Sequence, residues 1–345
     1  MIRYAAPIIL LLYSTLTSGC HQQDKLFQYQ FFAFGTLIEL SLWEVDQATA
    51  ERAQETIFED FSYLHQDWHP WHTGTLARIN ALLHTGDPIA APPSVMGLIN
   101  ASIPPFESSG GLFNPAIGKL VELWGFHLDD LPTVPPEPSA IRALVAQHPS
   151  MNDLAIDGIK LKSANPAIKL DFGAFAKGRA IDLAIRKLRR MGVDNALVNA
   201  GGDLGAIGMR GQRHWRIGIR HPRQNGIIAW LETVGNESVF TSGDYERFFF
   251  YEGRRYHHII DPRNGYPTDD TILVTVVHPE AAIADAAATA LFVAGPELWE
   301  QTARDMGITY VLLIDHRGHI HMSPEMAKRI SFTVDPQTGI GIPES

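Results

Sequence analysis

The segment from residue 169 to 178, KLDFGAFAKG, combines an aspartate and a lysine with small residues, a composition that suits a site for a phosphate-bearing ligand. Residues 167–170 are predicted to end a strand, and apolar residues at helical spacing over 180–188 predict a helix after it. A strand that enters a helix through small residues leaves the first-turn N–H groups free to bind an anion. Asp171 and Lys177 would lie at the mouth of this turn. Taken alone, the segment is also compatible with an ordinary strand-to-helix junction capped by its aspartate.

Asp285 and Thr289 lie four residues apart in an alanine-rich segment, 281–293, that is predicted to be a helix. Residues four apart share one helical face. Two oxygen-bearing side chains at this spacing could hold a magnesium ion, with carbonyls, waters and ligand phosphates completing the shell. A solvated helix face is the alternative for this pair.

Three histidines, His65, His69 and His72, are spaced so that one helical face could present three imidazoles to a metal. Pro70 interrupts any helix in this span. We therefore expect a loop, in which Trp71 or its neighbour Trp68 offers an aromatic surface.

Two similarities to nucleotide-binding motifs do not hold. Asp171-Phe172-Gly173 spells the magnesium-binding triplet of protein kinases, but no His-Arg-Asp loop or glycine-rich nucleotide loop precedes it. The glycines between residues 201 and 208 have the wrong spacing for a dinucleotide fingerprint, and no helix is predicted after them. The kinase interpretation therefore fails, and the sequence does not favour a Rossmann domain.

The chain has 345 residues, 45% of them hydrophobic, and carries a net charge of −10. It is long enough to bury a large core as one domain or as two intimately packed subdomains. The acidic balance argues against a nucleic-acid partner, and an anionic ligand would need a local cation or helix N-termini to be bound.

Residues 1–19 contain one basic residue followed by an apolar run that is too short to span a bilayer, which predicts an export signal. Cys20 is the only cysteine and follows small residues, as in a bacterial lipoprotein signal. We expect Cys20 to be lipidated as the mature N-terminus, so that residues 20–345 are tethered to a membrane and face the periplasm or another extracytoplasmic space. A cleaved signal with an incidental cysteine is the alternative.

The rest of the pattern predicts an α+β fold. Residues 27–43 are expected to form two strands around Phe34-Gly35-Thr36, and residues 50–64 a helix. A period close to two from residue 215 to 259 predicts several further strands. Because helices are grouped instead of alternating strictly with strands, mainly antiparallel sheets are favoured over a doubly wound sheet.

Taken together, these segments resemble the ApbE family of FAD:protein FMN transferases, bacterial envelope proteins also called flavin transferases. The resemblance spans nearly the whole mature chain. It is carried by Phe34-Gly35-Thr36, Leu112 to Phe126, Asp171 to Gly178, Asn199 to Asp203, Thr241 to Arg247, His258 to Pro267, and Asp285 to Gly295.

The resemblance implies a T-fold-like α+β domain that binds FAD and Mg²⁺, transfers FMN to a serine or threonine of an acceptor protein, and releases AMP. Asp171 and Lys177 match FAD-contacting positions. Asp285 and Thr289 match metal ligands, and Ala174 matches a position whose carbonyl helps to hold the metal.

Other matched positions would line the flavin nucleotide: Phe34, Trp71, Leu112, Phe113, Asn114 and Ile260. Two positions depart from the family pattern. Ala288 stands where some members have an acidic residue beside the metal, and Phe34 replaces the more usual methionine, a swap that keeps an apolar contact.

The implied reaction needs a cation to offset the diphosphate charge and a base to deprotonate the acceptor hydroxyl. His258 is the first candidate for the base, with Asp261 and Asp244 as further base or orienting candidates. His257 should point to the opposite face of its strand. Two other functions share this site: a magnesium-dependent FAD pyrophosphatase giving FMN and AMP, and a flavin-binding lipoprotein without catalysis.

Overall fold

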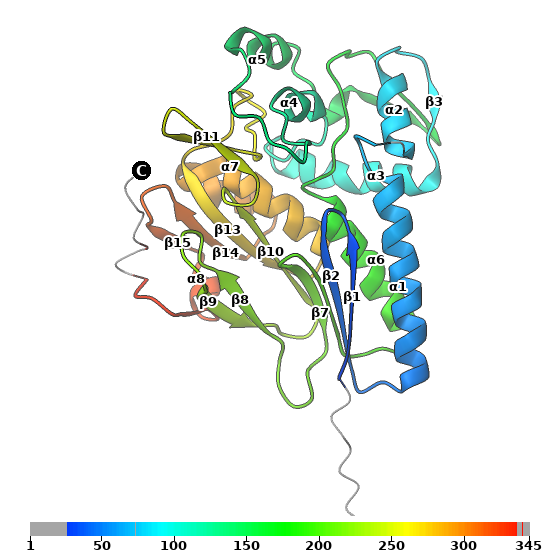
Figure 1. The fold of residues 1–345 in the computed structure, drawn as a ribbon, viewed down its shortest axis with the longest axis vertical. Helices are drawn as coiled ribbons and strands as arrows, with labels where there is room; N and C mark the ends of the chain where they lie inside the picture. Colours follow the sequence, from blue (N-terminus) through cyan, green and yellow to red (C-terminus); the bar gives the residue numbers. More distant parts are fainter. Residues whose placement is uncertain (1–25, 73, 337–339, 341–345) are drawn as a thin grey trace, which may run out of the picture.

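The computed structural model of the chain describes residues 26–72, 74–336 and 340. The predicted signal segment and Cys20 lie outside these described residues. The described part is built on a large central sheet covered by helices on one face and by a small sheet on the other (Figure 1).

Within the described residues the central sheet has eight strands in the order β1-β2-β6-β7-β10-β13-β14-β15, and all neighbouring strands are antiparallel. The strands are β1 (Leu26–Ala33), β2 (Thr36–Trp43), β6 (Ala196–Ala200), β7 (Asp203–Ile207), β10 (Glu237–Gly243), β13 (Thr271–His278), β14 (Tyr310–Asp315) and β15 (Ile320–Met322). The predicted hairpin over residues 27–43 is therefore confirmed, and so is the mainly antiparallel α+β fold.

Both faces of the sheet are buried, which explains why β13 reads as an almost continuous apolar run. Val274 and Val276 point into the core shared with the helices, whereas Leu273 and Val277 point into a second core. That second core is closed by a sheet of β8 (Arg216–Arg220), β9 (Ile227–Glu232) and β16 (Ser331–Phe332), together with the short α8 (Pro324–Ala327). Alternate side chains of one strand thus stabilise two separate layers.

Three helices form the layer next to the site: α1 (Gln47–Asp67), α6 (Ala176–Arg190) and α7 (Ala281–Asp305). Helix α7 includes the helix predicted at residues 281–293 and continues to Asp305, with a kink at Gly295, whose φ is 70°. By length and composition α7 is the one described helix that could cross a membrane. However, 72% of its most apolar window is buried inside the fold, as is usual for the core helix of a water-soluble domain.

The remaining elements form a cap above the end of α7 in Figure 1. They are α2 (Thr75–Leu83), α3 (Pro93–Ser108), α4 (Gly118–Leu123), α5 (Pro138–Val145), the strands β3 (Ile89–Ala90), β4 (Leu154–Asp157) and β5 (Lys160–Ser163), and the hairpin of β11 (Phe248–Tyr251) and β12 (Arg254–His257). Trp124 is fully buried here and donates a hydrogen bond to the Gly265 carbonyl at 2.8 Å. A Cβ atom at Gly265 would lie 2.7 Å from the side chains of Ile141 and Val145, so only glycine fits this contact.

The strand predicted at residues 167–170 is wrong. Only Lys169 makes a single bridge, to Ile117. The backbone of Leu170 is instead bonded on both sides by the Asn80 side chain, which donates to its carbonyl and accepts from its N–H, each at 2.8 Å. The main chains of Lys169 and Asp171 bond to residues 115–118, but the Asn80 amide takes the place of a strand partner at Leu170.

Candidate functional site

Lys177, in the first turn of α6, forms an ion pair with Asp203 at the start of β7. The other oxygen of the Asp203 carboxylate accepts the N–H of Thr241 in β10 at 3.0 Å. Burial alone would lower the pKa of Lys177, but the carboxylates of Asp203 and Asp285 raise it above its usual range. Lys177 is therefore a permanent cation with two acidic neighbours.

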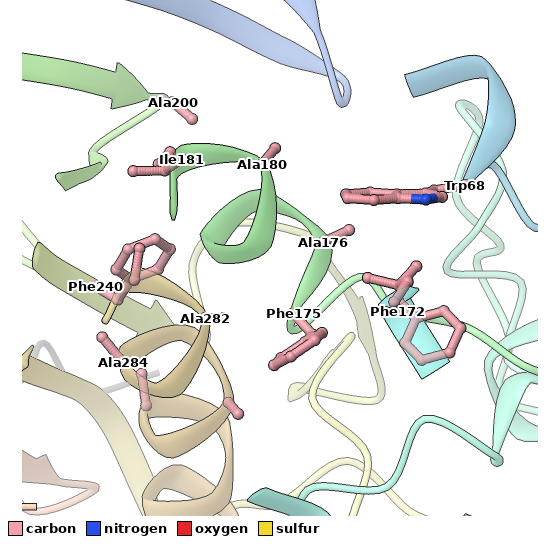
Figure 2. Close-up of a cluster of buried hydrophobic side chains, with 14 of the residues drawn as sticks. Trp68, Phe172, Phe175, Ala176, Ala180, Ile181, Ala200, Phe240, Ala282 and Ala284 are labelled. Atoms are coloured by element: carbon pink, nitrogen blue, oxygen red, sulfur yellow. The ribbon is translucent and has the colours of Figure 1, made fainter. Parts of the chain in front are cut away.

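Asp285 is brought to the same place by a very close approach of α6 and α7. Its Oδ2 accepts the N–H of Gly178 at 2.9 Å, and a Cβ atom at Gly178 would lie 2.4 Å from the Ala281 carbonyl oxygen. Figure 2 shows the small and apolar side chains of both helices, including Ala176, Ala180, Ala282 and Ala284, that line this region. Glycine and alanine therefore place a buried carboxylate against the helix N-terminus.

A second contact fixes the two helices. The side chain of Asp182 in α6 accepts the N–H groups of Ala281 and Ala282 at 2.8 and 3.0 Å, which caps the first turn of α7. Carboxylates on each helix thus bind main-chain N–H groups of the other helix, and these contacts fix the position of Asp285 relative to the first turn of α6.

Several hydroxyl groups surround the carboxylates. Thr289 lies one turn after Asp285, and its hydroxyl is 3.4 Å from that of Ser242 in β10. The hydroxyls of Thr241 and Thr275 are 2.9 Å apart. The predicted helical spacing of Asp285 and Thr289 is confirmed by the geometry of α7.

The described residues include no group of three or more His, Cys, Asp or Glu side chains that could hold a metal. The local oxygen atoms nevertheless suit magnesium, which keeps several waters and takes only one or two protein carboxylates. The Oδ1 atom of Asp285 has no hydrogen-bond donor among the described residues, and the Thr289 hydroxyl is one helical turn away. Burial raises the pKa of Asp285, although the Lys177 charge opposes the rise. A buried carboxylate of this kind gains from a cation.

His257 is the last residue of β12, and His258 follows it directly. His257 is buried, with Nε2 2.6 Å from the Thr268 carbonyl and Nδ1 accepting the Ile259 N–H at 3.3 Å. His258 has a buried Nδ1 without a hydrogen-bond partner in the described part of the chain. Burial lowers the pKa of His258 to about 3, with smaller contributions from His257 and Lys177. Its imidazole is therefore neutral at pH 7.

Asp244 and Asp261 are both engaged with arginines. Arg223 binds Asp244 through two hydrogen bonds of 2.7 and 2.6 Å. Asp261 accepts from the backbone N–H and the guanidinium of Arg263 at 2.8 to 3.1 Å. Of the two roles predicted for these aspartates, this geometry favours orientation over proton abstraction.

Asp171 and Ala174 lie in the turn before α6. The Asp171 carboxylate accepts the Gly173 N–H at 2.8 Å, and its own N–H donates to the Pro115 carbonyl at 2.8 Å. Burial raises the pKa of Asp171, against the opposing effects of Gly173 and Lys169. Asp171 shapes the turn and does not cap the helix, since α6 has no side-chain cap.

The predicted aromatic contacts lie at the rim of the same region. Phe34 is half-buried, with a φ of 52° and an N–H that donates to His65 at 3.1 Å. The rings of Trp71 and His127 are tilted by 34° with their centroids 4.5 Å apart, and the Lys169 ammonium lies 4.2 Å from the centre of the Trp71 ring. His65 falls in the last turn of α1, so the loop begins only after it.

The other predicted flavin-lining residues are mostly internal. Phe113 and Ile260 are buried, and Leu112 is partly buried against the core. The Asn114 side chain donates to the Pro149 carbonyl at 2.9 Å and accepts the Ala116 N–H at 3.0 Å. These side chains hold the turn together, which leaves its backbone as the surface available to a ligand.

The described residues form two hollows. One, of about 340 Å³, is lined in part by Asp261, Arg263 and Phe292, and the other, of about 460 Å³, in part by Arg223, Tyr245 and Phe248. Neither is lined by Lys177, Asp203 or Asp285, so the hollows do not coincide with this cluster of charges.

Sequence reasoning did not assign roles to Asp203, Ser242 or Thr241. A signal for Asp203 was present, because an acidic residue follows two glycines at the end of a predicted strand. The partners of these residues lie 26 to 47 positions away in the chain, and no local pattern specifies such contacts.

The model of the ApbE family matches residues 34–312. An FAD:protein FMN transferase of Rhodobacter capsulatus is 40% identical over 300 residues, covering 87% of this chain and 57% of that protein. One of Klebsiella pneumoniae is 32% identical over 284 residues, covering 79% of this chain and 84% of that protein. The chain therefore belongs to the ApbE family. It spans less than two thirds of the Rhodobacter relative.

Solved structures agree with this assignment. The ApbE protein of Thermotoga maritima has a TM-score of 0.80 at 29% identity, and covers 88% of this chain and 99% of its own. The flavin transferase ApbE of Vibrio cholerae has a TM-score of 0.77 at 25% identity, and covers 89% and 99%. The family and the fold predicted from the sequence are both confirmed.

Proposed function

We propose that this protein transfers FMN from FAD to a serine or threonine hydroxyl of an acceptor protein and releases AMP. Family membership and the activity named for its relatives support this function. The observation that carries this proposal is the hydrogen bond from the Gly178 N–H to the Asp285 carboxylate. It joins the segment 169–178 to the face of α7 that carries Asp285 and Thr289.

In this proposal the chain supplies binding and charge. Lys177 and the adjacent first turn of α6 bind the FAD diphosphate. Asp285, Thr289 and the Ala174 carbonyl would hold Mg²⁺, whose charge would offset that of the diphosphate and polarise the phosphorus under attack. Asp171 keeps the turn before α6 in the shape that this binding needs.

His258 is proposed as the base. The acceptor hydroxyl oxygen bonds to the phosphorus of the FMN half, the phosphorus–oxygen bond to AMP breaks, and the hydroxyl proton passes to the His258 imidazole. A pKa of about 3 keeps this imidazole neutral and able to accept. It also makes His258 a weak base, so nearby negative charge from bound FAD would be needed to raise its pKa.

Export and anchoring are part of the same proposal. The apolar run of residues 1–19 and the position of Cys20 support a lipid-anchored protein that meets its acceptor in the cell envelope. Metabolic labelling with a radioactive fatty acid would test this, since a Cys20→Ser variant should lose the label and leave the membrane fraction.

One assay separates the possible activities. The purified protein is incubated with FAD, Mg²⁺ and a candidate acceptor, and the acceptor is examined for flavin fluorescence after denaturing gel electrophoresis. A fluorescent acceptor band with equimolar AMP supports transfer. Free FMN and AMP without labelled acceptor would show a pyrophosphatase, and intact FAD would show a carrier.

A further inference from the structure

The proposed base His258 and two nearby residues, Arg247 and His127, each have a buried polar atom without a hydrogen-bond partner among the described residues, and the charge of Arg247 acts on both histidines. Within the described residues, His127 Nδ1, Arg247 Nε and His258 Nδ1 are buried and make no hydrogen bond. Arg247 connects the other two residues. Its Nη2 donates to the carbonyl of Leu128, the residue that follows His127, and its own carbonyl accepts the His258 N–H at 3.0 Å. Buried polar groups are normally paired, so three together indicate a place where a polar ligand binds.

The β11–β12 hairpin sets the direction of Arg247. Phe248 pairs with His257 in this hairpin, and the Arg247–His258 contact continues the ladder by one position. Directly opposite residues share a face, and successive residues alternate. We therefore infer that Arg247 points to the same side of the hairpin as His258, away from His257. Lys177 is also close to His258, because its charge lowers the His258 pKa.

Arg247 also differs from the neighbouring cations in its charge balance. Lys177 is paired with Asp203, Lys169 with Glu122, and Arg223 with Asp244. Arg247 has no carboxylate partner among the described residues and uses one N–H on a backbone carbonyl. In a protein of net charge −10, a half-buried guanidinium without a counter-ion is suited to bind an anion.

We propose that Arg247 binds the diphosphate of the FAD substrate beside His258, with its Nε–H directed at a phosphate oxygen. This inference rests on the proposed function and adds a substrate-binding residue to it. It also gives a source for the negative charge that His258 needs, since a phosphate held by Arg247 lies next to the imidazole.

The test measures FAD binding to the purified protein by flavin fluorescence, without acceptor, over a range of KCl concentrations. Arg247→Gln should weaken binding by about 10- to 100-fold, the usual effect of losing a hydrogen bond to a charged group. It should also make the dependence of Kd on salt shallower, because one cation–phosphate contact is gone. Arg254→Gln is the matched control, since Arg254 lies on the same hairpin but pairs with Asp269 at the surface; its Kd should be unchanged.

An Arg247→Gln variant that binds FAD within twofold of the parent, or more weakly with an unchanged salt dependence, would overturn the inference. If Arg247→Gln does not fold, Arg247→Lys carries the test: it should bind several-fold more weakly at an unchanged salt slope, and parental affinity would reject the role. If the parent protein labels the acceptor and the Arg247→Gln variant binds FAD as the parent does, only the proposed role of Arg247 is rejected. A parent that does not bind FAD rejects the proposed function as well.

Discussion

Lys177 lies between two carboxylates that come from different parts of the chain. Asp203 holds its ammonium group directly, and Asp285 acts on it through space. Removing the lysine would leave both buried acids without compensation, and breaking such a pair is far more destabilising than its net contribution suggests. The proposed phosphate-binding lysine therefore also stabilises the fold.

We therefore expect Lys177→Met to lower the free energy of unfolding by about 3 kcal/mol. Adding Asp203→Asn should recover part of this loss, because one of the uncompensated charges is removed. Urea unfolding of the single and double variants measures the effect. Additive losses in the double variant would show that the two residues do not act as a pair.

Asp285→Asn separates metal binding from folding. Asparagine can still accept the Gly178 N–H through its side-chain oxygen, so the thermal midpoint should stay near that of the parent. Magnesium-dependent turnover should fall by about 100-fold or more, since the charged ligand is lost. The rate is followed across a magnesium titration, and a parental titration curve would remove Asp285 from the metal site.

At the scale of elements, the contact between α6 and α7 positions the site. The two helices approach so closely that Gly178 has no room for a Cβ atom, and Asp182 caps α7 from the side of α6. An error in this one contact would move Asp285 relative to Lys177. Precise placement of charged groups depends on such rigid supports.

Gly178→Ala should therefore separate the helices and lower stability by about 1–3 kcal/mol, as overpacking commonly does. Activity should fall with it, because the Gly178–Asp285 hydrogen bond must lengthen. Gly97→Ala is the matched control: Gly97 lies in α3 with open space around its Cβ position, and there alanine should raise stability by about 1 kcal/mol. Thermal unfolding and turnover of both variants decide whether crowding or helix propensity dominates.

At the scale of the whole molecule, the β11–β12 hairpin connects the cap to the rest of the fold and leads into His257 and His258. Burial lowers the pKa of His257 to about 4 and that of His258 to about 3. In the unfolded chain both titrate near their ordinary value of about 6.5. At these two histidines the unfolded state therefore binds more protons than the folded state between pH 6.5 and pH 4, whereas the raised pKa of Asp285 acts in the opposite direction.

Stability rises with pH wherever the unfolded state binds more protons, so protonation of these two histidines destabilises the fold. The contribution of the two histidines to the free energy of unfolding should fall as pH is lowered from 7 to 4, by about 1.4 kcal/mol for each pKa unit of each group. Replacing His257 by Gln should make this dependence less steep. Urea unfolding at a series of pH values tests it, and equal slopes for parent and variant would contradict the assignment.

The sequence by itself determined the family, the antiparallel α+β fold, the hairpin over residues 27–43 and the common face of Asp285 and Thr289. These follow from local periodicity and from short motifs, which each segment carries within itself. The almost continuous apolar run of β13 also fits its burial on both faces.

The tertiary structure alone decided which polar groups meet. Gly178 and Asp285 are 107 positions apart, and Leu170 and Asn80 are 90 apart. The pairing of Lys177 with Asp203, and the absence of a carboxylate beside Arg247 in the described residues, likewise depend on how separate elements pack. Local patterns cannot specify these contacts, because the free energy of a buried polar group depends on the partners that folding brings to it.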